Sequence, residues 1–167
     1  MTRFSPESGP VLLTGADGFL GANLARALLG RGFRVRALLQ PGRKVGTLDG
    51  LPVEEFRADL ADAATLARVV EGSSAVVHTV ASTAVWPSRD PRQRLLNRDL
   101  ALALATSARE AGVRRFVHVG TANSFAAGTK EAPGDERGAY DAGRFGLDYQ
   151  DSKREAQERL LELKLSA

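Results

Sequence analysis

Short apolar runs alternate with amphipathic helical patterns along the whole chain, and this alternation restricts the fold more than any other feature of the sequence. The strand-like runs are residues 10–15, 33–39, 53–56, 74–81 and 114–120. The helical patterns are residues 19–32, 61–72, 91–112 and about 146–165, with Asp62 as the expected cap of the second helix. Parallel strands need helical crossovers of one hand, so the sequence predicts an α/β fold with a single parallel sheet.

The expected sheet is doubly wound, with helices on both faces and the strand order 3-2-1-4-5. In such sheets a ligand binds beyond the carboxyl ends of the strands, where the order reverses. Here that place lies between the first run, 10–15, and the fourth, 74–81. Residues 121–145 are polar and rich in glycine, and we expect them to form a long loop.

A glycine-rich stretch, "TGADGFLG", follows the first strand directly. Gly15 suits a tight turn, Gly18 lets the backbone approach a diphosphate, and Gly21 lets the next helix pack closely on the strand. Free N–H groups and the positive dipole end of that helix favour phosphate binding. A glycine-rich turn without a ligand is the alternative, but the position between a strand and an amphipathic helix favours a dinucleotide. We therefore predict one dinucleotide-binding domain of the Rossmann type over residues 1–167.

The end of the second strand bears on the choice of cofactor. NAD sites usually carry an acid there for the ribose 2′-hydroxyl, whereas "VRALLQPGRK" has no acid and contains Arg36, Arg43 and Lys44. A guanidinium can hold a 2′-phosphate with two charge-assisted hydrogen bonds. The sequence thus favours NADP(H), with NAD(H) possible; for Arg43 alone, a solvated surface arginine is an equally good interpretation.

Composition excludes several other classes of protein. The chain has no cysteine and only two histidines, so we expect no metal site. Its 23 basic and 20 acidic residues are interleaved and give a net charge of +3, which does not favour nucleic-acid binding. No run approaches the roughly 20 apolar residues of a membrane span, and the N-terminus does not resemble a signal peptide. We expect a cytoplasmic location and no membrane contact.

Several motifs in order resemble the extended short-chain dehydrogenase/reductases, the NAD-dependent epimerase/dehydratase family. These motifs are "TGADGFLG", "RADL" (57–60), "VVHTVA" (76–81), Asn97, "FVHVGTANSF" (116–125) and "YQDSK" (149–153). "VRALLQPGRK" further resembles the dihydroflavonol reductase-like members. The resemblance covers essentially the whole chain and implies an enzyme that moves hydride to or from a carbonyl or secondary alcohol.

The resemblance also implies roles for particular residues. Thr121 would orient the substrate carbonyl, Tyr149 would be the acid/base and Lys153 its partner. Asn97 would support catalysis, although an amide that only packs the helix is an alternative. Asp59 would contact the adenine. The full set of expected cofactor contacts is Gly15, Gly18, Phe19, Leu20, Gly21, Arg36, Arg43, Lys44, Asp59, Leu60, Val80, Ala81, Tyr149 and Lys153.

The chemistry of these residue types agrees with such roles. Residues four apart on a helix share a face, so Tyr149 and Lys153 are expected to lie together. An ammonium ion beside a phenol favours the phenolate, which is the form that accepts a proton. A solvated pair on a helix surface is the alternative, and the presence of Thr121 and the glycine stretch makes it weaker.

Complete members of this family continue after the lysine helix and add a smaller domain that closes over a small-molecule substrate. The sequence has no counterpart of that domain, so we expect it to correspond to the cofactor-binding part of such an enzyme, with the fifth strand left as an open edge. The family also implies a homodimer, formed here by helices that carry Leu95, Leu102, Leu160 and Leu161. Two other functions stay open: a sugar-nucleotide epimerase or dehydratase that uses NAD, and a nucleotide-binding module without turnover.

Overall fold

The computed structural model describes residues 5–163, and its internal contacts group the chain into two compact units. The first unit contains residues 5–80 and Ala103–His118, and the second contains Ala81–Leu102 and residues 119–163. The expected last helix extends to residue 165, so its final two residues lie outside the described part. The assignment of residues 1–167 to one domain stays a prediction.

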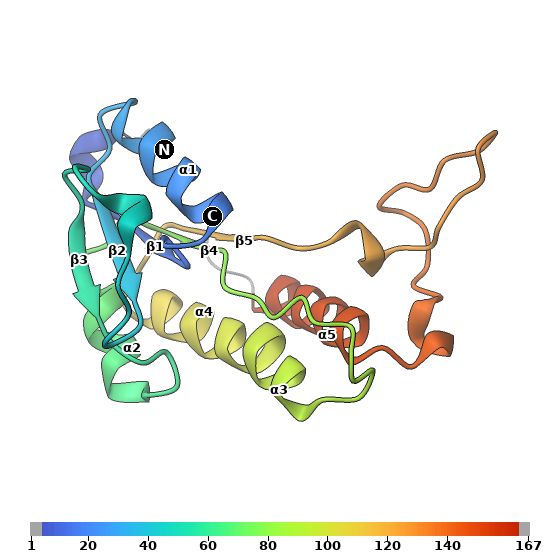
Figure 1. Cartoon of the computed structure of the whole chain (residues 1–167). Coiled ribbons are helices and arrows are strands. Elements are labelled where there is room, and N and C mark those ends of the chain that lie inside the picture. The colour runs from blue at the N-terminus through green and yellow to red at the C-terminus, as the bar shows by residue number, and fades with distance from the viewer. Residues whose placement is uncertain (1–4, 164–167) are drawn as a thin grey trace. The chain divides into compact units, whose positions relative to one another are not determined.

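The first unit is built on a five-stranded sheet, whose strands are labelled in Figure 1. The order is β3-β2-β1-β4-β5 and every neighbouring pair is parallel, which confirms the predicted doubly wound topology. The strands are β1 (Val11–Thr14), β2 (Val35–Leu39), β3 (Glu54–Arg57), β4 (Ala75–His78) and β5 (Arg115–His118). Within the described residues β5 pairs only with β4, and Val117 of β5 is 49% exposed.

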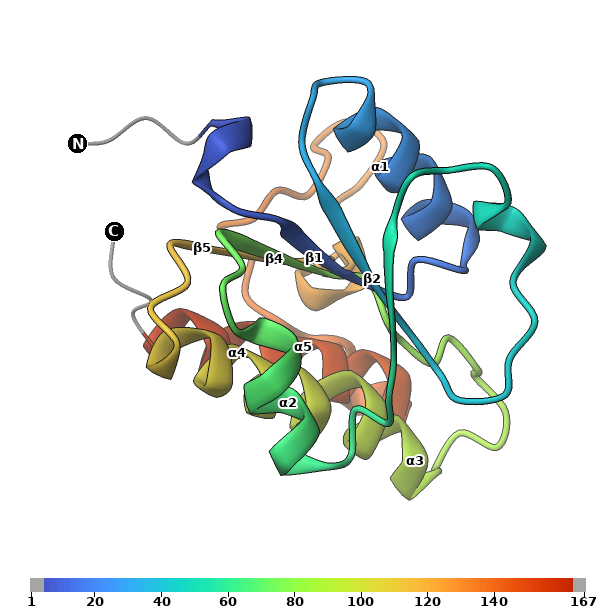
Figure 2. The ribbon, with the colours of Figure 1, turned by 90° about the vertical axis from the view of Figure 1, so that its left-hand side faces the viewer.

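Alternation along the strands divides the core of the first unit between two faces of the sheet. Leu12, Leu38 and Val76 pack with α2 (Ala63–Val70) and with residues 103–110 of α4 (Leu100–Glu110). Leu13 and Leu39 pack against α1 (Phe19–Leu29) on the opposite face, and Figure 2 shows α1 and α2 on the two sides. Because successive side chains of a strand point to opposite faces, near-continuous apolar runs are needed to cover both.

The junction of β1 and α1 is the tightest place in the first unit. Gly15 has φ +67°, and a Cβ at Gly21 would lie 2.1 Å from the Gly15 carbonyl oxygen. The Thr79 hydroxyl donates to the Thr14 carbonyl at 2.8 Å and holds the turn from the side of β4. Only glycine permits α1 to begin this close to the end of β1, because every other residue adds a Cβ there.

The second unit consists mainly of helices and loops. Its elements are α3 (Pro91–Arg94), a π-helical turn (Leu95–Asp99), the start of α4, a 3₁₀ turn (Ala122–Ser124), another (Ala142–Phe145) and α5 (Asp148–Glu162). The π turn interrupts the helix predicted over residues 91–112, which otherwise runs without a break from Pro91 to Glu110. Single π turns of this kind occur often at functional sites.

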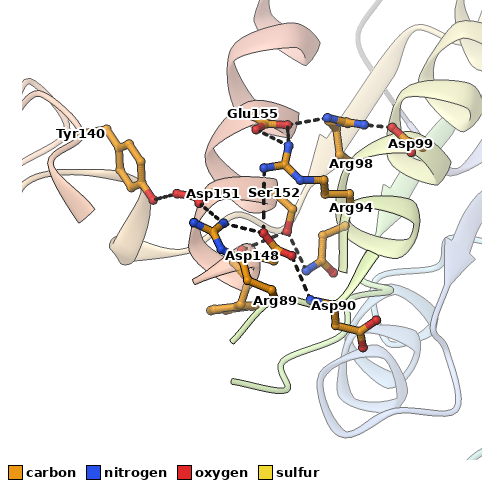
Figure 3. Close-up of polar contacts among 12 residues, drawn as sticks. Arg89, Asp90, Arg94, Arg98, Asp99, Tyr140, Asp148, Asp151, Ser152 and Glu155 are labelled. Carbon is orange, nitrogen blue, oxygen red and sulfur yellow. Dashed lines mark hydrogen bonds and ion pairs between the residues drawn. The ribbon is translucent and has the colours of Figure 1, made fainter. Parts of the chain in front are cut away.

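A network of ion pairs connects α5 to the segment that begins before α3, as Figure 3 shows. The Arg89 guanidinium donates to Asp148 at 2.8 Å, and the main-chain N–H of Asp90 donates to the other oxygen of Asp148 at 2.9 Å. Farther along α5, Glu155 accepts from Arg94 at 2.6 and 2.8 Å and from Arg98 at 2.5 Å. Asp148 is buried, so these contacts also replace the water that its carboxylate gives up.

The four leucines expected at a homodimer interface differ in exposure, and the homodimer stays a prediction. Leu95 is 46% and Leu161 73% exposed, whereas Leu102 and Leu160 are half-buried.

Gly21→Ala should destabilise the fold, because the new Cβ would collide with main-chain atoms of Gly15 that cannot move independently. We expect a loss of at least about 2 kcal/mol in the free energy of unfolding, measured by urea denaturation. Gly46→Ala is the matched control, since the nearest atom to its Cβ is an Asp49 oxygen 3.8 Å away. The control should stay within about 0.5 kcal/mol of the wild type. Equal effects of the two substitutions would refute the close-approach explanation.

Arg89→Gln should make the stability of the chain less dependent on pH in acid. The hydrogen bond from Arg89 is the largest cause that lowers the pKa of Asp148. A carboxylate with a lowered pKa stabilises the fold above its unfolded pKa of about 3.9, and this contribution is lost as pH falls through the folded pKa. The variant should therefore be less stable than the wild type at pH 7, and the difference should shrink below about pH 4.

The measurement is denaturant unfolding at a series of pH values. Arg92→Gln is the control, since it removes the same charge from an exposed position three residues along the chain. A constant difference between Arg89→Gln and the wild type from pH 7 to pH 3 would contradict the linkage to Asp148.

Candidate active site

The N-terminus of α1 has the features expected of a phosphate-binding site. Gly18 occupies the N-cap with extended backbone, and no side chain caps this end of the helix. Phe19 and Leu20, in the first turn, are 90% and 45% exposed. The first N–H groups of a helix need an acceptor from outside the helix, and the positive end of the dipole favours an anion. An exposed, glycine-bounded and uncapped N-terminus therefore fits the diphosphate of a dinucleotide.

The loop after β2 is attached to this glycine turn by side-chain contacts. The Arg43 Nε lies 2.8 Å from a carboxylate oxygen of Asp17. The Thr47 hydroxyl donates to the main-chain oxygen of Asp17 at 3.1 Å, and Arg26 donates to the main-chain oxygen of Thr47 at 2.7 Å. Arg43 is thus held next to the glycine turn, and Lys44 is exposed beside it in sequence.

Arg36 lies elsewhere, contrary to the expectation that it would join Arg43 near a 2′-phosphate. It is the second residue of β2, on the α2 face, where its guanidinium donates to Glu54 at 2.9 Å and to the Val69 and Glu71 carbonyls at 3.0 and 2.7 Å. Those carbonyls end α2 and precede β4, so they lie at the amino end of the sheet, away from the ligand edge. We therefore leave Arg36 out of the proposed site.

Four other expected cofactor contacts lie just beyond strand ends. Asp59 follows β3 and is exposed, with one carboxylate oxygen accepting from the main-chain N–H of Ala61 at 2.9 Å. Leu60 is half-buried against the core on the α2 face. Val80 follows β4, and its Cγ2 would lie 3.2 Å from a Cβ at Gly15, which places it against the glycine turn. Ala81 is exposed and belongs to the second unit.

In the second unit, α5 holds the Thr121 segment from both sides. The Lys153 ammonium donates to the Val119 carbonyl at 2.6 Å, and Arg154 donates to the Ser124 carbonyl at 3.0 Å. Thr121 lies between these two points, where it caps the first 3₁₀ turn and accepts from the Asn123 N–H at 3.3 Å. The structure thus brings the segment that carries Thr121 against the helix that carries Tyr149 and Lys153.

Burial distinguishes Lys153 from an ordinary surface lysine. It is 2% exposed, and burial lowers its pKa below the usual value. A buried lysine that donates to a main-chain carbonyl has little freedom to move, so its ammonium has a defined position.

The two tyrosines of the chain have different surroundings. The Tyr140 hydroxyl donates to Asp151 at 2.6 Å, and burial together with this carboxylate raises the pKa of Tyr140. A phenol held by a carboxylate is a poor proton acceptor at neutral pH. Tyr149 is half-buried in the first half of α5, four residues before Lys153. Of the two, Tyr149 is therefore the better candidate acid/base.

Asn97 is a buried amide at the centre of the π turn, with each polar atom bonded. Its oxygen accepts from the Ser82 N–H at 2.8 Å, while its nitrogen donates to the Ser82 carbonyl at 3.0 Å and the Gln93 side chain at 3.0 Å. The same nitrogen lies 3.2 Å from the Ser152 hydroxyl, which in turn donates to the Tyr149 carbonyl at 3.0 Å. Asn97 thus connects the loop after β4 to the helix that carries Tyr149.

Sequence reasoning missed two contributors, Asp17 and Ser152. Asp17 stands inside the glycine stretch, and the charge complement between "GADG" and "QPGRK" is the signal that could have revealed its contact with Arg43. Ser152 stands inside "YQDSK". No local pattern indicates that its hydroxyl accepts a hydrogen bond from Asn97, which lies 55 residues earlier in the chain.

Two kinds of site are absent from the described part of the chain. Residues 5–163 contain no group of three or more acidic or histidine side chains placed to hold a metal ion. Among the same residues, no helix is both long and apolar enough to cross a bilayer.

Known proteins resemble this chain in sequence. A sequence model of the NAD dependent epimerase/dehydratase family matches residues 11–163. The chain is 44% identical over 110 residues to sterol demethylase protein B of Methylococcus capsulatus, covering 64% of this chain and 33% of that protein. It is 32% identical over 154 residues to a 3 beta-hydroxysteroid dehydrogenase/Delta 5→4-isomerase of Mycobacterium tuberculosis, covering 88% of this chain and 40% of that protein. The chain thus spans less than half the length of these relatives.

Solved structures have the same fold. The crystal structure of gox2253 superposes with a TM-score of 0.84 at 28% identity, over 93% of this chain and 47% of that one. A UDP-glucose 4-epimerase of Thermus thermophilus in complex with NAD superposes with a TM-score of 0.80 at 23% identity, over 93% and 50% of the two chains. With a family match that covers almost all the described residues, the chain belongs to the NAD-dependent epimerase/dehydratase family.

Proposed function

We propose that this chain is the cofactor-binding and catalytic part of an NADP(H)-dependent oxidoreductase that acts on a carbonyl or secondary alcohol. The observation that carries the proposal is the attachment of the Thr121 segment to α5 by Lys153 and Arg154. This attachment supports the joint action of Thr121, Tyr149 and Lys153. Membership of the family and relatives named as a dehydrogenase and as dihydroflavonol reductases agree with an NAD(P)-dependent enzyme.

In this proposal each residue has one task. The Thr121 hydroxyl binds the substrate carbonyl oxygen and orients it. The Tyr149 phenol gives a proton to that oxygen in reduction and takes it back in oxidation. Lys153 holds positive charge beside the phenol and donates to the cofactor ribose. The bound nicotinamide cofactor supplies or accepts the hydride.

Asn97 acts in the proposal as a positioning residue rather than a catalytic one. Its bonds to Ser82 and Ser152 hold the loop after β4 and the first half of α5, which includes Tyr149. A buried amide with all of these bonds made is costly to replace, because its partners would be left unsatisfied.

The preference for NADP(H) rests on Arg43 and Lys44 beyond β2. Arg43 keeps a 59% exposed side chain next to the glycine turn, where a 2′-phosphate would meet it if the diphosphate bound at the start of α1. A second candidate is an epimerase or dehydratase that uses NAD, which is favoured by the Asp17 carboxylate beside Arg43, since an acid suits a free ribose 2′-hydroxyl.

Tyr149→Phe should lower turnover by about 10²–10⁴-fold while cofactor affinity stays nearly unchanged, because the ring remains and only the hydroxyl group that carries the transferable proton is removed. The measurement is NADPH oxidation with a panel of aldehydes and ketones, together with fluorescence titration of NADPH. Tyr140→Phe is the matched control and should retain turnover, since its hydroxyl is held by Asp151.

Turnover by Tyr149→Phe equal to that of the wild type would rule out its role as the proton donor. A wild type that binds cofactor but reduces no compound in the panel would instead favour a nucleotide-binding module without turnover.

Arg43→Gln should weaken NADPH binding about tenfold and leave NADH binding unchanged, because only NADPH carries the 2′-phosphate. Fluorescence titration of both nucleotides measures the two affinities. Arg34→Gln is the control, since it removes the same charge just before β2, at the opposite end of that strand. Tighter binding of NADH than of NADPH by the wild type would count against the NADP(H) preference.

A further inference from the structure

We propose that Asp17 is a specificity-determining residue, whose carboxylate competes with the 2′-phosphate of the cofactor for the guanidinium of Arg43. This inference rests on the proposed function, in which the glycine turn binds a pyridine dinucleotide. The carboxylate of Asp17 would weaken the binding of NADPH but not of NADH, so the difference between the two affinities would be smaller than without it.

The ion pair between Asp17 and Arg43 is part of the fold and is held from two sides. Its Nε–oxygen distance is 2.8 Å, and the side chain of Asp17 is 13% exposed while that of Arg43 is 59% exposed. The main chain of Asp17 accepts from Thr47, and Arg57 donates to the main-chain oxygen of Arg43 at 2.8 Å. Hydrogen bonds thus hold the main chain of both partners in place. Little further conformational entropy is lost when the carboxylate pairs with the guanidinium.

The pair lies where the 2′ position of a cofactor is read in this fold. Asp17 directly precedes Gly18, the N-cap of α1, and Arg43 follows the end of β2 at Leu39 by four residues. In doubly wound folds the diphosphate lies at the start of the first helix, and the ribose hydroxyls lie beyond the second strand. The acid that NAD sites carry at the end of the second strand is here supplied by the glycine turn.

The two cofactors differ at this point by a doubly charged group. A 2′-phosphate that binds Arg43 must displace the carboxylate of Asp17 or share the guanidinium with it, and both outcomes oppose binding because the two groups have the same sign. A ribose 2′-hydroxyl has no charge and can donate a hydrogen bond to the carboxylate. Asp17 therefore weakens NADPH binding and does not weaken NADH binding.

The contacts also separate this role from a purely structural one. Thr47 donates to the main-chain oxygen of Asp17, not to its side chain. Asp17→Asn removes the negative charge with little change in shape and keeps this bond. The loop between β2 and β3 should thus stay attached to the glycine turn in the variant.

The test compares Asp17→Asn with the wild type in the full chain by fluorescence titration of NADPH and NADH. The ratio of NADPH affinity to NADH affinity should rise about tenfold in the variant, and the rise should shrink at high salt because a charge interaction is screened. The same comparison with 2′,5′-ADP and 5′-AMP isolates the 2′-phosphate from the nicotinamide. Asp49→Asn is the matched control, since it removes an exposed carboxylate from the loop between β2 and β3 that carries Arg43.

The Arg43→Gln background shows whether the effect passes through the guanidinium. Asp17→Asn should change the affinity ratio less in that background than alone, because the guanidinium for which the carboxylate and the 2′-phosphate compete is absent. Asp17→Ser repeats the measurement with a second side chain, and thermal unfolding of each variant checks that it is folded.

An affinity ratio that falls, stays constant, or rises equally in Asp49→Asn would overturn the role of Asp17 while the proposed function stands. A wild type that binds neither nucleotide overturns the proposed function, and this inference with it.

Discussion

The close approach of α1 to the end of β1 is the constraint on which the proposed cofactor site depends. The helix begins at Phe19 only because Gly15 turns with a positive φ and Gly21 has no Cβ to strike the Gly15 carbonyl. This contact points the uncapped N-terminus of α1 beyond the carboxyl ends of the strands. It also gives Asp17 a defined position, because the residue stands inside the same turn. The proposed phosphate site and the proposed cofactor discrimination therefore share one structural origin.

Buried polar contacts hold α5 in the second unit. Asp148 and Lys153 are both nearly inaccessible, and each is held by partners of fixed geometry. Burying charged groups is costly unless they are bonded, so the loss of one partner costs more than its presence contributes. Such a network specifies one arrangement of α5 against the segments around it, and the candidate acid/base lies on that helix.

Charge at the glycine turn is a balance rather than a simple excess of positive residues. The sequence of the loop after β2, taken alone, favours NADP(H). The ion pair of Arg43 with Asp17 places an acid beside the same guanidinium, and an acid near a ribose 2′-hydroxyl would favour NAD.

Much of the fold and part of the site follow from local patterns. Apolar runs of strand length, helices between them and glycines three apart specify a parallel doubly wound sheet, because period, length and turn chemistry are properties of neighbouring residues. The candidate pair Tyr149 and Lys153 can be predicted for the same reason, since residues four positions apart on a helix share a face. The Asp62 cap was also predictable, and its carboxylate accepts from the Ala64 N–H at 3.1 Å.

Only the tertiary structure decided the partners of residues far apart in sequence. Arg36 looked like a phosphate ligand, but its place on the α2 face leads its guanidinium to the carbonyls that end α2. The π turn around Asn97 and its bond to Ser152 depend on a helix that comes 55 residues later. Asp17 became the partner of Arg43 because the loop after β2 folds back onto the glycine turn. The physical reason is the same in all three cases. The sequence determines which side chains are charged or can form hydrogen bonds, and tertiary packing determines which distant segments come close enough to become their partners.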